Sequence, residues 1–154
     1  MIEQRLFTIE QTETTSDDYY TPKWIFDTLG LHFDLDVASP PHSTNVPCDR
    51  YFTQADDGLG QDWHGRVWMN PPFSGTGPWV YRWLHHANGI ALLPVTNSTK
   101  WMNALWNSAA KHCYILNIAF DRPGGKTARP WTPVWLWAIG DDNIQALRKM
   151  GNIR

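Results

Sequence analysis

The sequence predicts an α/β protein whose largely parallel sheet is covered by helices on both faces. Apolar runs of strand length alternate along the chain with segments of helical periodicity, and the connections between them are short. No internal repeat interrupts this alternation. The chain has 154 residues, which is enough for one sizeable core. We therefore expect one compact domain over residues 18–154, preceded by a flexible arm at residues 1–17 that is rich in Thr, Glu and Gln.

The individual elements follow from periodicity and from capping residues. The first helix is expected to begin at Pro22, because a missing N–H costs nothing in a first turn, with Thr21 as its cap and Gly30 at its end. Period-two alternation or short apolar runs predict strands at residues 31–37, 50–53, 66–70, 90–95, 113–120 and 134–139. Apolar residues at helical spacing predict further helices at 78–87, from a cap at 96–98 to about 111, and at 143–150. Between these elements we expect loops at 74–77 and 121–130.

Composition and charge exclude several classes of protein. The formal net charge is −2, from 13 Lys and Arg against 15 Asp and Glu, so any contact with nucleic acid must be local. Cys48 and Cys113 lie in no metal-ligand spacing, which favours reduced thiols in a cytoplasmic protein without a metal site. Residues 1–10 lack the pattern of a signal peptide, and no run approaches the ~20 apolar residues of a membrane span. The sequence thus predicts a soluble protein that makes no membrane contact.

A rigid turn at Asn70-Pro71-Pro72-Phe73 follows the strand expected at 66–70. Neither proline can donate a backbone hydrogen bond or continue a sheet ladder, so the strand stops and a stiff turn begins. In open α/β sheets, ligands bind at the carboxyl ends of the strands. The turn therefore places the Asn70 and Phe73 side chains beside one another at the edge where a ligand is expected. The alternative is a proline-rich surface turn with an incidental asparagine and a core phenylalanine.

Such a turn is suited to one kind of chemistry. An exocyclic amino group on a nucleobase is a poor nucleophile, because its lone pair is delocalised into the ring. The Asn70 side-chain oxygen and a backbone carbonyl near Pro71 can each accept one of its N–H bonds, which would localise that lone pair. The Phe73 ring offers a face on which the base can stack, worth roughly 1–3 kcal/mol.

Several motifs resemble the small phage-type (Dam-like) DNA N-6-adenine methyltransferases. The turn at Asn70-Pro71-Pro72-Phe73 matches the Asn/Asp-Pro-Pro-Tyr/Phe motif of amino-methyltransferases, and Tyr20-Thr21-Pro22 is similar to their N-terminal cofactor-side motif. Phe33-Asp34-Leu35-Asp36-Val37-Ala38 resembles their first strand with its acidic end, and Asp57-Gly58-Leu59 ahead of Trp63 also matches. The resemblance runs in the right order from about residue 17 to 140.

The resemblance implies a Rossmann-like methyltransferase fold, S-adenosylmethionine as methyl donor and adenine in DNA as acceptor. It implies that Asn70 and the Pro71 carbonyl hold the target amine in the turn shaped by Pro72, while Phe73 stacks on a base that has left the duplex. Cofactor contacts are implied for Tyr20, Thr21, Pro22, Asp36, Ala38, Ser39, Asp57 and Leu59. A phage-derived enzyme would work in the cytoplasm of its bacterial host, and we expect a monomer or a weak homodimer.

Two features depart from the usual methyltransferase pattern. The first strand is followed by Ser39-Pro40-Pro41-His42 in place of a glycine-rich turn, and Asp49 is only a candidate ligand for the cofactor ribose. Sequence reading must come from loops, for which we nominate 74–77 and 121–130. In the second loop, contacts with DNA phosphates are expected from Arg122, Lys126 and Arg129. Cytosine-N4 methylation and a non-catalytic DNA-binding protein with the same fold remain the alternatives.

Overall fold

A computed structural model describes residues 19–41, 44–115, 118–122, 124–130 and 132–151. The strands are β1 (Phe33–Asp36), β2 (Cys48–Tyr51), β3 (Val67–Met69), β4 (Gly89–Pro94), β5 (Lys111–Tyr114), β6 (Phe120–Arg122), β7 (Lys126–Ala128) and β8 (Val134–Ile139). The α-helices are α1 (Lys23–Leu29), α2 (Thr76–His86), α3 (Lys100–Trp106) and α4 (Asp141–Leu147). Short 3-10 turns lie at Gln54–Asp56, Gly58–Gly60, Phe73–Gly75 and Arg148–Met150. The arm predicted at 1–17 lies outside the described residues.

The central sheet has the strand order β2-β1-β3-β4-β8-β5 in the described part of the chain. Strands β2, β1, β3 and β4 pair in parallel, and β8 runs antiparallel to both β4 and β5. It follows that β5 points the same way as the parallel group. The fold is therefore α/β with a mixed, mainly parallel sheet, compatible with a Rossmann-like arrangement.

Helices cover both faces of this sheet, as the sequence predicts. On one face, apolar side chains of α1 and α4 pack against Phe33, Trp68 and Leu136 in a common core. On the other face, side chains of α2 and α3 pack against Val67 and Trp137. Neighbouring residues of one strand, such as Val67 and Trp68, enter opposite cores because side chains alternate across a sheet. Burial on both faces explains why these strands read as continuous apolar runs.

The first helix begins one residue later than expected. Helix α1 starts at Lys23, with Pro22 as its N-cap residue, and no side chain caps it. The prediction that Thr21 is the cap is wrong, because the Thr21 hydroxyl accepts a hydrogen bond from the Asn70 side chain instead. The helix ends as predicted at Gly30, which has a φ of 64° and donates its N–H to the Phe26 carbonyl.

The other three helices also differ from their predicted bounds, and α4 spans Asp141–Leu147 rather than 143–150. Helix α2 begins at Thr76 after a 3-10 turn, so residues 74–77 do not form the expected loop. Helix α3 ends at Trp106 rather than near residue 111. The Ser108 hydroxyl and N–H both donate to the Leu105 carbonyl and close the helix end, which frees Lys111 to begin β5.

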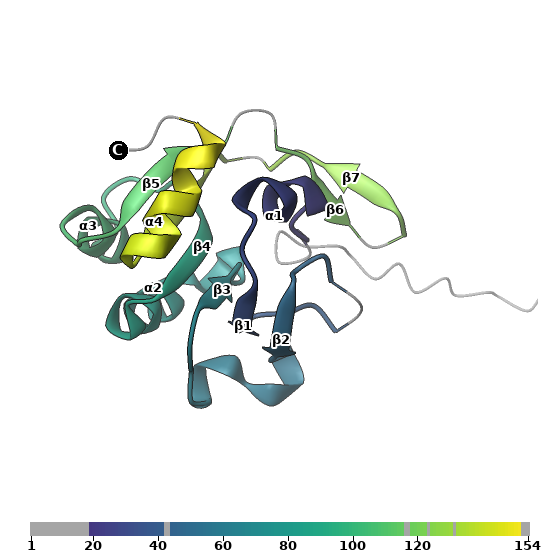
Figure 1. The fold of residues 1–154 in the computed structure, drawn as a ribbon, viewed down its shortest axis with the longest axis horizontal. Helices are drawn as coiled ribbons and strands as arrows, with labels where there is room; N and C mark the ends of the chain where they lie inside the picture. Colours follow the sequence, from purple (N-terminus) through teal and green to yellow (C-terminus); the bar gives the residue numbers. More distant parts are fainter. Residues whose placement is uncertain (1–18, 42–43, 116–117, 123, 131, 152–154) are drawn as a thin grey trace, which may run out of the picture.

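The prediction of one strand at 113–120 followed by a loop at 121–130 is wrong, and this difference affects the proposed site. Strand β5 ends at Tyr114, and β6 pairs with β7 as an antiparallel hairpin. Gly124 and Gly125 have φ values of 81° and 72°, the left-handed conformation that a tight hairpin connection needs. In Figure 1 this hairpin, drawn in light green, stands beside α1 and outside the main sheet. The predicted phosphate contacts therefore lie on a defined β-hairpin.

Candidate active site

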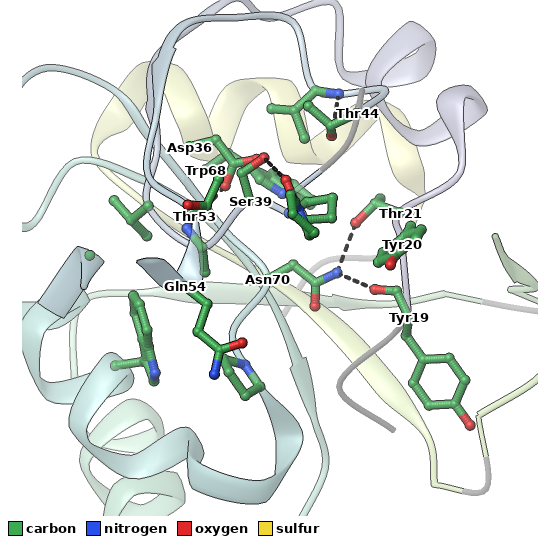
Figure 2. Close-up of a pocket in the computed structure, with 18 of the residues that line it drawn as sticks. Tyr19, Tyr20, Thr21, Asp36, Ser39, Thr44, Thr53, Gln54, Trp68 and Asn70 are labelled. Carbon is green, nitrogen blue, oxygen red and sulfur yellow. Dashed lines mark hydrogen bonds between the residues drawn. The ribbon is translucent and has the colours of Figure 1, made fainter. Parts of the chain in front are cut away.

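A cavity of about 370 Å³ opens at the carboxyl ends of β1 and β3. Its volume lies in the range of small-molecule sites, and its position is the edge at which α/β sheets bind ligands. Figure 2 shows the side chains around it, which come from the segment before α1, the ends of β1 and β3, and the turns after β2. The cavity thus joins segments that are far apart in sequence.

The Asn70 side chain has a fixed orientation at this cavity. Its Nδ2 donates to the Tyr19 carbonyl oxygen at 2.9 Å and to Thr21 Oγ1 at 3.1 Å. A carbonyl oxygen can only accept, so the amino side of the amide must face Tyr19. Figure 2 shows the Asn70 oxygen turned away from both partners. The amide oxygen is thereby left to accept hydrogen bonds from a group in the cavity.

A buried carboxylate lies at the end of β1. Asp36 is 1% exposed and lines the cavity, where its Oδ1 accepts the Ala38 N–H at 3.2 Å. Burial raises the pKa of Asp36 to about 7, and the hydrogen bond from Ala38 acts in the opposite direction. A desolvated carboxylate is stabilised by a cationic partner, so this end of the cavity favours an ammonium or another cation.

The turn after β1 contains prolines and still forms part of the cavity wall. Ser39 donates its N–H to the Phe52 carbonyl at 2.8 Å, and Phe52 donates to the Asp36 carbonyl at 2.9 Å. These bonds hold the turn against the end of β2, so Ser39, Pro40 and Pro41 reach the cavity without a glycine-rich sequence. Opposite them, a Cβ on Gly58 would collide with the Val37 carbonyl, so only glycine permits this close approach.

The turns after β2 and the start of α2 complete the opposite wall. Thr53, Gln54 and Asp57 line it with polar groups, and Trp79 adds an aromatic surface. Trp63 stacks on Trp79 with ring centroids 6.4 Å apart, and its Nε1 donates to the Gly58 carbonyl at 2.8 Å. This wall combines polar groups with an indole face, which is a suitable lining for a nucleoside.

Phe73 lies in a separate aromatic group and does not line the cavity. Its ring is tilted against Tyr19 at 6.0 Å between centroids and meets Phe120 edge-on at 6.5 Å. Tyr19 in turn stacks on Phe120 at 5.0 Å. Tyr19 does line the cavity, so it connects this aromatic group with the site. The stacking role of Phe73 stays a prediction.

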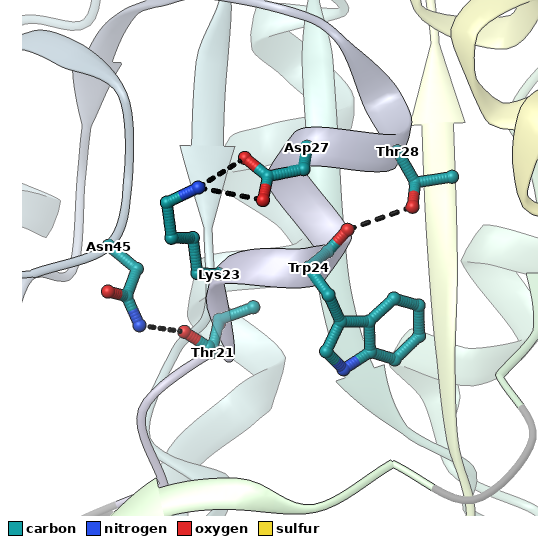
Figure 3. Close-up of polar contacts among 6 residues, drawn as sticks. All are labelled: Thr21, Lys23, Trp24, Asp27, Thr28 and Asn45. Atoms are coloured by element: carbon teal, nitrogen blue, oxygen red, sulfur yellow. Dashed lines mark hydrogen bonds and ion pairs between the residues drawn. The ribbon is translucent and has the colours of Figure 1, made fainter.

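The segment Tyr19–Pro22, here called the strap, is attached to the β6–β7 hairpin. Tyr20 and Asp121 exchange two backbone hydrogen bonds of 2.9 Å. Asn45 Nδ2 donates to the Thr21 carbonyl and to Asp121 Oδ2, each at 3.1 Å; Figure 3 shows the first of these bonds. The Arg122 guanidinium lies over the Tyr19 ring at 4.8 Å. The hairpin therefore sits directly beside the strap that orients Asn70.

Comparison with known proteins agrees with these observations. A family model described as DNA N-6-adenine-methyltransferase (Dam) matches residues 9–129. The DNA N-6-adenine-methyltransferase of Haemophilus phage HP1 (strain HP1c1) is 34% identical over 123 residues, which cover 73% of this chain and 70% of that protein. The chain belongs to the DNA N-6-adenine-methyltransferase (Dam) family. No solved structure gives a significant match.

Membership of the Dam family confirms the expected activity class, adenine-N6 methylation of DNA. The comparisons favour neither cytosine-N4 methylation nor a non-catalytic DNA-binding protein.

In the described part of this Dam-family chain, no helix has the length and apolar character needed to cross a membrane. The same residues contain no group of three or more His, Cys, Asp or Glu side chains placed to hold a metal ion.

Most of the predicted site residues of this Dam-family chain meet at the cavity. Those that line it are Tyr20, Thr21, Asp36, Ala38, Ser39, Asp57, Asn70 and Pro72. Those that do not line it are Pro22, Leu59, Pro71 and Phe73. Asp49, the candidate ribose ligand, also lies away from the cavity, where its carboxylate pairs with His32 Nε2 at 2.6 Å. Lys126 and Arg129 are exposed on or next to β7.

Six lining residues of the Dam-family site had no signal in the sequence that marked them as functional: Tyr19, Thr44, Val46, Thr53, Gln54 and Trp79. Tyr19 directly precedes the Tyr20-Thr21-Pro22 motif, so adjacency alone could have found it. Trp79 falls on the apolar face of α2, where periodicity indicates only core packing. Thr53 was predicted at the end of a strand, but β2 ends at Tyr51, and Thr53 caps the 3-10 turn that begins at Gln54. Only the packing of this turn brings the two residues to the site.

Proposed function

We propose that this Dam-family chain uses S-adenosylmethionine as its methyl donor and holds it in the cavity at the ends of β1 and β3. The main support for this proposal is the environment of the Asp36 carboxylate, which is desolvated, faces the cavity and lacks a cationic partner among the described residues. The ammonium group of the cofactor supplies such a partner. The cavity volume and the location at the strand ends also suit a nucleoside cofactor.

The proposed cofactor contacts divide between the two ends of the cavity. Asp36, Ala38 and Ser39 would hold the amino-acid portion, and the strap residues Tyr20 and Thr21, positioned by Pro22, would close over it. At the other end, Asp57 would flank the adenine ring, and Thr53 and Gln54 would offer polar groups to the ribose. Leu59, which does not line the cavity, would reach the adenine ring only after a shift of the turn that contains it. When bound, the cofactor supplies an electrophilic methyl group. We further propose that the fold is the Rossmann-like methyltransferase fold.

Asn70 is proposed to hold and polarise the amino nitrogen of the target adenine. Its Oδ1 and the Pro71 carbonyl would each accept one N–H bond, which draws the nitrogen toward tetrahedral geometry and localises its lone pair. The fixed amide orientation supports this role, because the acceptor atom is the one left available. Phe73, supported by Tyr19 and Phe120, is proposed to stack on the flipped base after a small rearrangement toward the cavity.

Product analysis tests the proposed reaction. The protein is incubated with duplex DNA and S-adenosylmethionine labelled in its methyl group, and the DNA is then digested to nucleosides. We expect the label in N6-methyl-2′-deoxyadenosine. Label in the N4-methylcytosine nucleoside would establish the first alternative. Absence of label, together with no heat on titration with the cofactor, would support the second alternative, a non-catalytic DNA-binding protein.

We propose that the cations of the β6–β7 hairpin contact DNA phosphates. Lys126→Gln and Arg129→Gln should each weaken DNA binding similarly for all sequences, because a phosphate contact carries no base information. Each change should also lower the slope of log affinity against log salt concentration by about 0.9. Lys111→Gln on β5 is the matched control, since Lys111 is also exposed but lies on the far edge strand of the sheet. Equal slopes for all four proteins would contradict the assignment.

A further inference from the structure

The orientation of Asn70 depends on two atoms that belong to the strap. The Tyr19 carbonyl accepts one proton of the Asn70 amide, and Thr21 Oγ1 accepts the other. Because the carbonyl has no proton to give, the amide cannot be flipped without placing two acceptor oxygens against each other. The strap therefore selects the orientation in which Oδ1 has no hydrogen-bond partner among the described residues.

We propose that Thr21 and the Tyr19 carbonyl are positioning groups for Asn70. We further infer that these two groups require asparagine, and not aspartate, at position 70 of this chain. This inference rests on the proposed function of Asn70. The motif in amino-methyltransferases accepts asparagine or aspartate at this position. An aspartate at position 70 would bring a carboxylate oxygen against the Tyr19 carbonyl oxygen, with no proton between them. In this chain the two residue types are consequently not interchangeable.

The strap is itself held from two sides, which makes it a defined element and not a loose segment. The two backbone hydrogen bonds between Tyr20 and Asp121 join it to β6. Asn45 fastens the Thr21 carbonyl to the Asp121 carboxylate through two hydrogen bonds from one amide nitrogen. Because Asp121 precedes Arg122 on β6, the hairpin that carries the DNA-binding cations also anchors the strap. Asn45 and Asp121 thus position Asn70 indirectly, because they hold the strap that contacts it.

Kinetics of Thr21 variants test the positioning role. Thr21→Val keeps the shape of the side chain and removes the acceptor, whereas Thr21→Ser keeps the acceptor. With saturating cofactor and DNA, we expect Thr21→Val to lower kcat about three- to tenfold, the equivalent of one lost hydrogen bond, and Thr21→Ser, which restores the acceptor, to recover most of that loss. A higher KM for the cofactor in Thr21→Val with unchanged kcat would overturn the proposal, because it would make Thr21 a cofactor contact only.

Asn70→Asp tests the commitment to asparagine. We expect this variant to lose at least about 100-fold in kcat although the family motif permits aspartate. Wild-type kcat in Asn70→Asp would overturn the proposal. Asp121→Ala should have two opposite effects. Removal of a carboxylate beside the proposed DNA-binding cations should tighten DNA binding, while loss of the hydrogen bond from Asn45 should lower kcat, although the backbone bonds between Tyr20 and residue 121 remain. Tighter binding with unchanged kcat would show that the Asp121 side chain does not help to anchor the strap.

A measurement without cofactor or DNA separates this proposal from the proposed function. The two side-chain amide protons of Asn70 can be assigned by NMR through comparison with Asn70→Ala. We expect both to exchange slowly with water in the wild type, and the proton that Thr21 Oγ1 accepts to exchange at least tenfold faster in Thr21→Val. Fast exchange in the wild type would overturn the positioning role whether or not the protein methylates DNA. Slow exchange in a protein that does not methylate DNA would instead overturn the proposed function alone.

Discussion

Asn70→Ala is expected to reduce kcat for methyl transfer to DNA by at least about 100-fold while the protein remains folded. The variant loses the amide oxygen that would accept an N–H bond of the target amine, so the lone pair of that nitrogen stays delocalised. Removal of one well-placed hydrogen-bonding group from an active site typically lowers kcat by about 100- to 1,000-fold. Single-turnover transfer of labelled methyl groups measures the loss, and thermal unfolding verifies the fold.

Asn107→Ala is the matched control for this prediction. Asn107 is exposed at the end of α3, and its side chain donates only to the carbonyl and side-chain oxygens of Asn103 among the described residues. We expect this variant to retain the wild-type rate. Because Asn70 also ties β3 to the strap, a modest loss of stability in Asn70→Ala is compatible with the prediction. Equal rates for Asn70→Ala and the wild type would show that the motif does not hold the target amine.

Asp36→Asn is expected to weaken cofactor binding and to change the pH dependence of both binding and stability. The folded protein holds the Asp36 pKa at about 7, above its ordinary value of 3.8, because the carboxyl group is desolvated. A raised pKa means that the contribution of this group to stability is fully present below about pH 4 and is lost as pH rises through 7. The wild-type protein without cofactor should lose on the order of 3–4 kcal/mol of unfolding free energy from this group across that range.

Asp36→Asn has no ionisable group at this position, so the variant should be more stable than the wild type at pH 8 and similar to it near pH 4. Cofactor affinity should show the opposite trend, since the ammonium group needs the charged carboxylate. In the wild type, affinity should fall about tenfold for each pH unit below 7, and in Asp36→Asn it should be lower and nearly independent of pH from 5.5 to 7. Denaturant unfolding and titration calorimetry provide the two measurements.

The control is Asp27→Asn, which removes an exposed carboxylate on α1 that pairs with Lys23 at 2.7 Å (Figure 3). An exposed pair of this kind contributes little to stability, so we expect no comparable pH effect. Wild-type cofactor affinity in Asp36→Asn at pH 7 would show that the ammonium group does not bind at this end of the cavity. That result would remove the main support for the proposed cofactor site.

The central elements of the sheet were predictable because each carries a strong local pattern. Strands β3, β4 and β8 are apolar runs bounded by Asn, Gly or Pro, and burial on both faces of a sheet requires such runs. The hairpin was not predictable in the same way. Its strands have three residues each, mix polar and charged side chains, and flank two glycines, so they read as a loop. Backbone pairing, not side-chain periodicity, forms this element.

The residues of the candidate site also fall into two groups, those whose position could be predicted from local sequence and those whose position could not. Asp36 and Asn70 could be placed at one cavity from the sequence, because the carboxyl ends of neighbouring parallel strands must meet at one edge of the sheet. Gln54 and Trp79 could not, since their approach depends on how the turn after β2 packs against α2. The sequence also placed Phe73 next to Asn70 on the cavity, whereas the turn directs its ring toward Tyr19 and Phe120.

Local sequence was enough to identify the α/β class and to place the Asn-Pro-Pro-Phe turn at the carboxyl end of a strand, and it predicts the chemistry of that turn. These properties depend on backbone restrictions and side-chain periods that act over a few residues. The orientation of the Asn70 amide was decided only in the folded protein, by the Tyr19 carbonyl and the Thr21 hydroxyl some fifty residues away in the chain. A hydrogen bond between such distant segments has no local signature, because it exists only after the strap and the sheet have packed together.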